Sequence, residues 1–193
     1  MSTQPGDRRA LIAASGIRII ARDGVRSLTH RAVDREAEIP QGSTSYHART
    51  RNALVELIVD ELTTRSAADA ASFSTTLNDS SADVVGPEPL AARLAGLIER
   101  LANRRDDMKA RYALMLELDD DSELRLRLTT HSDVQDIAEH VTADALAQAG
   151  LPHTHDHVRQ LLTLTDALLL YRTTIADPTA NKILATYLHG TLG

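Results

Sequence analysis

A run of small and polar residues near position 40 holds most of the groups in this sequence that suit close contact with a polar partner. The run offers an amide, three hydroxyls, a glycine and two rings with polar tips, in the order Gln41, Gly42, Ser43, Thr44, Ser45, Tyr46 and His47. Amides and hydroxyls form hydrogen bonds with phosphates and base edges, and a glycine lets the backbone approach closely. A helix that begins with so few bulky apolar residues is therefore free to contact another molecule.

Two short helices joined by a tight turn are predicted to position these groups. Thr29 stands where an N-cap belongs, and Ala32, Val33 and Ala37 then share one helical face. Pro40 breaks this helix and is predicted to open the second one, because proline fits the first turn of a helix but not its interior. Such a helix pair has the shape that fits the major groove of DNA.

Helices are also predicted on both sides of this pair. Residues from Asp7 to Asp23 carry apolar side chains at spacings of three and four, and Gly24 marks the end of that helix. Thr50 is a candidate N-cap for a longer helix that runs to about Ala71. The first helix is expected to pack behind the pair.

The order of these segments resembles the DNA-binding domain of the TetR family of bacterial repressors. The resemblance covers roughly the first third of the chain and is carried by Leu28 to Val33, Ala37 to His47, Arg51 and Leu54. It implies an all-α homodimer that binds a palindromic operator in double-stranded DNA and holds a small-molecule inducer. The implied domains are a helix-turn-helix domain at residues 1–50, a connecting helix at 51–71, and a ligand-binding and dimerisation domain at 72–193.

The resemblance also assigns roles to single residues. The implied DNA-binding residues are Thr29 and His30 at the start of the positioning helix, Gln41, Gly42, Ser43, Thr44 and Ser45 facing the groove, Tyr46 and His47 at phosphates, and Arg51 in place of the family's usual lysine. Two positions depart from the family pattern. Ala48 replaces a usual phenylalanine, which implies a differently filled core, and Glu38 replaces a usual glycine, which implies a less relaxed turn.

Charge and composition agree with this division and limit the alternatives. Residues 1–65 contain ten arginines and eight acidic residues, whereas the other 128 contain eleven basic and nineteen acidic residues. A weakly basic head on an acidic body is expected of a DNA-binding protein with a separate regulatory domain. The absence of cysteine excludes disulfides, thiol catalysis and cysteine zinc sites. No apolar run approaches the ~18 residues of a membrane span, so a cytoplasmic protein without a membrane partner is expected.

The remainder of the chain is predicted to be helical. Residues from Ser72 to Pro89 are the best candidate for a linker, and a long helix is predicted to begin at Asp121 or Ser122 and to end at Gly150. The last two helices are the most apolar, and Asp177 and Pro178 are predicted to open the final one. The dimer interface is predicted to comprise Val158, Leu161, Leu162, Thr165, Leu168, Leu169, Arg172, Ile183 and Tyr187.

A ligand pocket is predicted from stripes of flexible and aromatic side chains in this second domain. The predicted lining is Met108, Tyr112, Met115, Leu128, His131 and Tyr171, which suits an apolar or aromatic ligand. The alternative is that the same residues form an ordinary hydrophobic core.

Other candidate sites are weaker. His153, His155 and His157 could bind a metal ion, but exposed loop histidines are common, and the run from Asp119 to Asp121 fits a helix cap better than a calcium loop. No catalytic residue and no cofactor is indicated, so the protein is not expected to be an enzyme. The alternative function is a helical enzyme, or a binding module whose N-terminal helix pair contacts other proteins.

Overall fold

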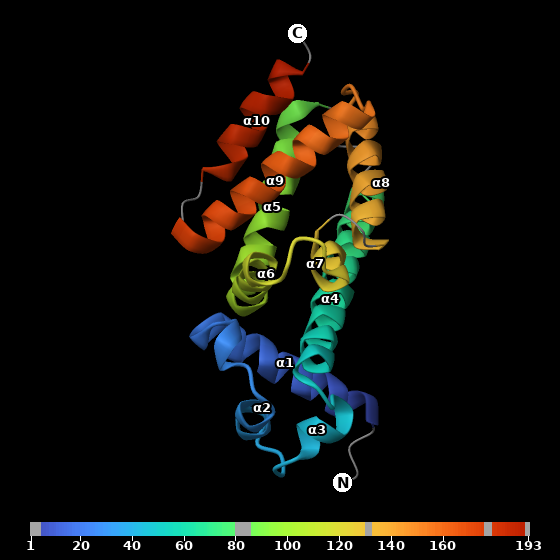
Figure 1. Ribbon diagram of the computed structural model, residues 1–193. Coiled ribbons are helices and arrows are strands. Elements are labelled where there is room, and N and C mark those ends of the chain that lie inside the picture. Colours follow the sequence, from blue (N-terminus) through green and yellow to red (C-terminus); the bar gives the residue numbers. More distant parts are fainter. Residues whose placement is uncertain (1–4, 80–85, 130–132, 176–178, 192–193) are drawn as a thin grey trace. The chain divides into compact units, whose positions relative to one another are not determined.

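The computed structural model describes residues 5–79, 86–129, 133–175 and 179–191. These residues form helices and no strands, which confirms the all-α prediction (Figure 1). The helices are α1 (Pro5–Asp23), a short 3-10 helix η1 (Val25–Ser27), α2 (His30–Glu36), α3 (Ser43–His47), α4 (Arg51–Asp79), α5 (Pro87–Asn103), α6 (Arg105–Glu117), α7 (Glu123–Leu128), α8 (Asp133–Gln148), α9 (His155–Ile175) and α10 (Ala180–Gly190).

The chain divides into two compact units. Unit 1 comprises residues 1–66 and 105–132, and unit 2 comprises residues 67–104 and 133–193. The helix α4 contributes its first part to unit 1 and the rest to unit 2. The predicted functional boundary between residues 71 and 72 stays a prediction, because this division records packing and not the role of each segment.

Unit 1 is built around the packing of α1 on α4, α6 and α2. Its core is aliphatic and includes Ile12, Ile17 and Leu28 together with Leu54 and Ile58, all of which are buried. The helices α6 and α7 close this core with Ala110, Leu114 and Leu128. Ion pairs join the same elements near the surface, where Arg65 of α4 donates to Asp107 of α6 over 2.7 Å and Arg127 of α7 pairs with Asp60 of α4. Residues 105–128 thus belong to the packing unit of the predicted DNA-binding helices.

Unit 2 is a helical bundle in which α5 lies beside both α9 and α10 (Figure 1). The helix α8 packs on α9. A bidentate ion pair, with distances of 2.6 and 2.8 Å, joins Arg172 of α9 to Glu99 of α5, and this hydrogen bonding lowers the pKa of Glu99. The buried residues of this bundle include Leu90 and Ile98 from α5, and Leu184 and Leu188 from α10.

Three of the predicted helix boundaries are wrong or only partly right. The predicted linker is helical up to Asp79, because Phe73 and Leu77 are four residues apart and bury the same face of α4. Ser122 does cap a helix, and its hydroxyl accepts from the Arg125 amide, but the predicted long helix is split into α7 and α8. Residues 177 and 178 lie outside the described residues, and Thr179 is the N-cap of α10.

Close packing at Gly16 yields a prediction about stability. A Cβ atom added at Gly16 of α1 would lie 2.9 Å from Cγ1 of the buried Ile58, and closer still to its Cδ1. We therefore expect Gly16→Ala to lower the free energy of unfolding by ~1–3 kcal/mol, because an overfilled core must shift. Chemical denaturation measures the change.

Gly96→Ala provides the matched control. A Cβ atom at Gly96 of α5 meets only Arg100 Nη1, at 3.7 Å, so this substitution is expected to be neutral or stabilising by up to ~1 kcal/mol. Equal effects of the two substitutions would contradict the tight packing of α1 on α4.

Candidate nucleic-acid interface

The two short helices predicted from the sequence are present as α2 and α3. Thr29 caps α2 as predicted, since its hydroxyl accepts from the Ala32 amide at 3.1 Å. The helix ends in a tight turn in which the Glu38 amide donates to Arg35 O and the Ile39 amide donates to Asp34 O. Glu38 has a φ of 52°, which explains why glycine is usual at this position.

Pro40 does not open the second helix. Residues 40 and 41 belong to the turn, Gly42 is the N-cap with a φ of 91°, and α3 begins only at Ser43. The Ser43 hydroxyl donates to the carbonyl oxygen of Pro40 at 2.6 Å, which ties the turn to the first residue of the helix. The second helix is therefore shorter than the sequence pattern predicts.

The buried side chain of Asp34 holds the start of α3 against α2. Its carboxylate accepts from the Gly42 amide at 2.7 Å and from the Thr44 amide at 2.8 Å, and the residue is only 4% exposed. Burial by itself raises the pKa of Asp34, but hydrogen bonds from Thr44 and from the Gly42 amide, with His30 nearby, bring the pKa below its usual value. The role of Asp34 was not predicted from the sequence. The available signal was an acidic residue eight positions before Gly42, close enough along the chain to accept from the start of the next helix.

The segment after α3 is anchored from the inside. Ala48 is 2% exposed, and His30 Nε2 donates to its carbonyl oxygen at 2.7 Å. The Ala48 amide donates to Thr44 O at 2.8 Å. The small side chain at position 48 thus still packs in the core, and both of its backbone polar groups have partners.

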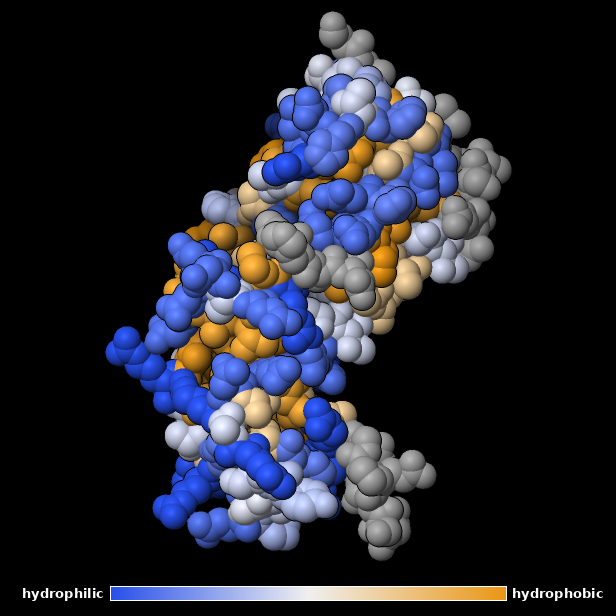
Figure 2. Space-filling model, turned by 45° about the vertical axis from the view of Figure 1, so that its right-hand side comes forward, coloured by the Kyte–Doolittle hydropathy of each residue, from blue (hydrophilic) through white to orange (hydrophobic). Residues whose placement is uncertain are grey.

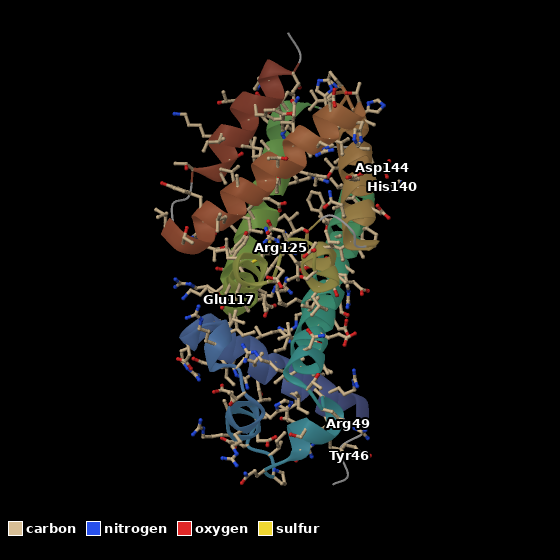
Figure 3. The ribbon with its side chains drawn as sticks, in the orientation of Figure 1. Tyr46, Arg49, Glu117, Arg125, His140 and Asp144 are labelled. Carbon is tan, nitrogen blue, oxygen red and sulfur yellow. The ribbon has the colours of Figure 1, made fainter. Side chains whose placement is uncertain are left out.

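The exposed polar residues of this segment gather at one end of unit 1. Gln41, Gly42 and Ser45 are exposed, Tyr46 is 83% exposed, and its ring meets the half-buried His47 edge to face at 5.2 Å. This end presents mainly hydrophilic residues (Figure 2). Tyr46 and Arg49 are both found at this end (Figure 3).

Three residues predicted to contact DNA are buried or have hydrogen bonds within the protein. Thr44 is completely buried, so its side chain does not face a groove. The Nε2 atom of His30 is occupied by Ala48 O. Arg51 donates from Nη1 to Leu28 O and from Nη2 to Val25 O, the latter at 2.8 Å, and so binds the segment between α1 and α2 to the start of α4.

The predicted ligand-binding residues are divided between the two units. Met108 and Leu128 are 4% and 2% exposed, and Leu128 belongs to the core of unit 1, with Met115 packed on that core. Tyr112 lies in the same unit and is half-buried. Tyr171 belongs to unit 2 and is 46% exposed, and His131 lies outside the described residues. The alternative of a hydrophobic core is thus the better description of Met108 and Leu128.

Four of the predicted dimer residues point into the chain's own core. Val158, Leu161, Leu168 and Leu169 are at most 7% exposed. Arg172 is engaged by Glu99, and Leu162 and Thr165 are half-buried. Ile183 is 40% exposed and Tyr187 is half-buried.

The remaining alternatives find no support in the part of the chain that the structure describes. No three His, Asp or Glu side chains there are grouped so that they could hold a metal ion. His155 and His157 belong to the first turn of α9 rather than to a loop, and His157 Nδ1 lies 2.7 Å from the Thr154 hydroxyl. None of the described helices combines the length and the hydropathy that a membrane span requires.

A comparison with protein families decides the class. The family of tetracyclin repressor-like C-terminal domains matches residues 85–193, which is more than half of the chain. The chain belongs to the TetR family. TetR-family proteins are transcriptional regulators, and DNA binding and ligand binding are typical of them. No curated protein matches the chain.

Solved structures of TetR-family proteins have the same fold. A member from Streptomyces coelicolor A3 is 25% identical, with a TM-score of 0.67 over 96% of this chain and 98% of its own. A TetR transcriptional regulator from Legionella pneumophila is 12% identical, with a TM-score of 0.67 over 98% of both chains. The multidrug binding protein EbrR, complexed with proflavin, is 26% identical, with a TM-score of 0.58 over 95% of this chain and 99% of its own.

Asp34 yields a prediction with a pH dependence. In Asp34→Asn one oxygen is replaced by an NH₂ group that faces an amide donor, so we expect a loss of ~1–3 kcal/mol of unfolding free energy at neutral pH. Because the pKa of Asp34 is lowered by folding, its contribution is present above its unfolded pKa of about 4 and is lost as the pH falls through the folded value. The difference in melting temperature between the two proteins should therefore close below about pH 4.

Glu38→Gln is the control, because Glu38 is an exposed acid in the same turn. It should melt like the wild type throughout the pH series. A difference between wild type and Asp34→Asn that is independent of pH would contradict the role given to the carboxylate.

Proposed function

We propose that this protein is a ligand-responsive repressor that binds a palindromic operator as a homodimer. The observation that carries the proposal is the preformed pair α2 and α3, whose exposed end offers polar groups on a fixed backbone. A short helix held in this way needs no reordering when it enters a major groove, and phosphate contacts then fix its register.

The exposed residues at this end divide into two roles. Gln41 and Ser45 are proposed to read base edges, because an amide and a hydroxyl are the groups that discriminate between bases. Tyr46 is proposed to contact a phosphate from its largely exposed position. His47 and Gly42 are proposed to lie at the edge of this DNA-binding surface. Thr29 is proposed to contribute indirectly, as the N-cap of α2.

Dimerisation is proposed to use the outer face of α9 with the neighbouring face of α10. Ala167, Leu170, Tyr171 and Ile175 are exposed, and helical spacing places Leu170 opposite the buried Leu161 and Leu168. Ile183 and Tyr187 of α10 lie four residues apart. Tyr187 lines a groove of about 650 Å³ together with Leu164 and Ala167 and with the polar or charged residues His155, Asp156, Arg159, Gln160 and Thr163. A symmetric dimer buries such a face on both copies at once.

Control by a small molecule completes the proposal. The similar structure of the multidrug binding protein EbrR in complex with proflavin supports the proposal that an apolar or aromatic compound changes the operator affinity of this protein. A ligand that prefers the DNA-incompetent state lowers operator affinity by the same factor by which operator lowers ligand affinity. Tyr112 and Met115 are the predicted contacts that stay candidates for this role.

DNA binding is tested by selecting the preferred duplex from a random pool and titrating it against a scrambled duplex. Gln41→Ala and Ser45→Ala should each reduce the discrimination between the two duplexes by ~1–3 kcal/mol, because each removes a base contact. Asn181→Ala, which removes the exposed side-chain amide of a residue in unit 2, should leave the discrimination between the two duplexes unchanged. If the wild type retains no duplex at ~50 mM salt, where phosphate contacts are strong, the protein is not a DNA-binding regulator.

The dimer interface is tested by light scattering at micromolar concentration. Tyr171→Asp should give folded monomers, because it places a carboxylate on the outer apolar face, whereas Leu168→Asp should unfold the protein, because it places the charge in the core. Asn181→Asp, which lies outside this face, should remain dimeric. A wild-type protein that is monomeric at these concentrations would contradict the proposed interface.

A further inference from the structure

Two arginines on either side of Thr50 have different surroundings. Arg49 and Arg51 both follow α3 and both are exposed to solvent in part, so the sequence alone does not distinguish them. The family resemblance favours Arg51, which stands in place of a usual lysine. The hydrogen bonds of the folded protein favour the other residue.

Arg51 is engaged by the protein itself. Its two terminal nitrogens donate to the carbonyl oxygens of Leu28 and Val25, which are three residues apart in the segment between α1 and α2. Leu28 is the extended C-cap of η1, so its carbonyl oxygen accepts no bond within a helix. A planar guanidinium with fixed donor directions suits such a bridge better than an ammonium group does.

Arg49 has the opposite environment. It is exposed, and the described part of the chain gives it no hydrogen bond and no ion pair. Its backbone is nevertheless well fixed, because the preceding Ala48 is buried with both polar groups bonded and the following Thr50 caps α4 by accepting from the Ala53 amide at 3.0 Å. Arg49 and Tyr46 are both found at the exposed end of unit 1 (Figure 3).

We propose that Arg49 is the cation of this segment that contacts a DNA phosphate, and that Arg51 is a positioning residue that holds the segment between α1 and α2. The inference rests on the proposed function and adds a partner group for Arg49. A free guanidinium on an anchored backbone pairs with a phosphate without first breaking an internal bond. Arg51 already directs two of its five N–H donors at backbone carbonyl oxygens, and these bonds fix its guanidinium against the segment between α1 and α2.

The test compares Arg49→Ala, Arg51→Ala, Arg51→Lys and the control Arg100→Ala, which removes an exposed arginine of α5 in unit 2. Binding to a random-sequence duplex is measured by fluorescence anisotropy as a function of salt, at a temperature where circular dichroism shows each variant to be folded. Melting temperatures are measured in parallel, so that electrostatic and structural roles are separated.

Arg49→Ala should reduce the steepness of the salt dependence by about one and weaken binding by about tenfold at ~0.1 M salt, because one counterion fewer is released. Its melting temperature should equal that of the wild type. Arg51→Ala should keep the wild-type salt dependence but melt at least ~2–4 °C lower. Arg51→Lys should also keep the wild-type salt dependence, with a melting temperature between those of the wild type and Arg51→Ala. Arg100→Ala should match the wild type in both measurements.

Two outcomes would overturn the assignment. In the first outcome, Arg49→Ala keeps the wild-type slope of log affinity against log salt concentration. In the second, Arg51→Ala is folded and melts like the wild type, but this slope is less steep by about one. In both cases the wild type binds duplex DNA, so the proposed function stands and only the role of Arg49 is lost. Absence of wild-type binding would instead remove the proposed function itself.

Discussion

A helix of five residues does not persist in water by itself, and the exposed end of unit 1 depends on how α3 is held. A buried carboxylate fixes α3 in place, because Asp34 on α2 accepts hydrogen bonds from two amides at the start of α3. A buried carboxylate is stable only with such partners, so the bond constrains both helices at once. Gln41 and Ser45 are placed relative to α2 by this contact and not by packing of their own side chains.

Local signals in the sequence predicted the helices whose ends are set by nearby residues. Thr29 and Ser122 cap helices as predicted, because a cap needs only an amide two or three positions ahead. The start of α3 was predicted three residues too early, at Pro40 instead of Ser43, because its position is set by Asp34, a partner from the preceding helix. The linker was misjudged because burial of Phe73 and Leu77 outweighs the polar composition around them.

The candidate site was harder to predict than the fold, for a related reason. Periodicity identifies the apolar residues of α9 but does not say which of them lie inside, so Leu161 and Leu168 were assigned to a dimer surface although they are buried and Leu170 is exposed. The roles of Thr44 and Arg51 depend on contacts with residues 10 to 26 positions away along the chain. A motif predicts the residue types at a site but does not say which of them are buried or hydrogen-bonded within the folded protein.

The left-handed residue in the turn has an energetic consequence of its own. Glu38 adopts a φ of 52°, which costs a residue with a side chain roughly 1–2 kcal/mol relative to right-handed backbone. That cost shifts the balance between the closed turn and its locally open forms by a factor of about 5–30. The amides of Glu38 and Ile39, which donate to Arg35 O and Asp34 O, are therefore expected to exchange with solvent deuterium sooner than those in the core helices. The turn between α2 and α3 is a local weak point in the stability of unit 1.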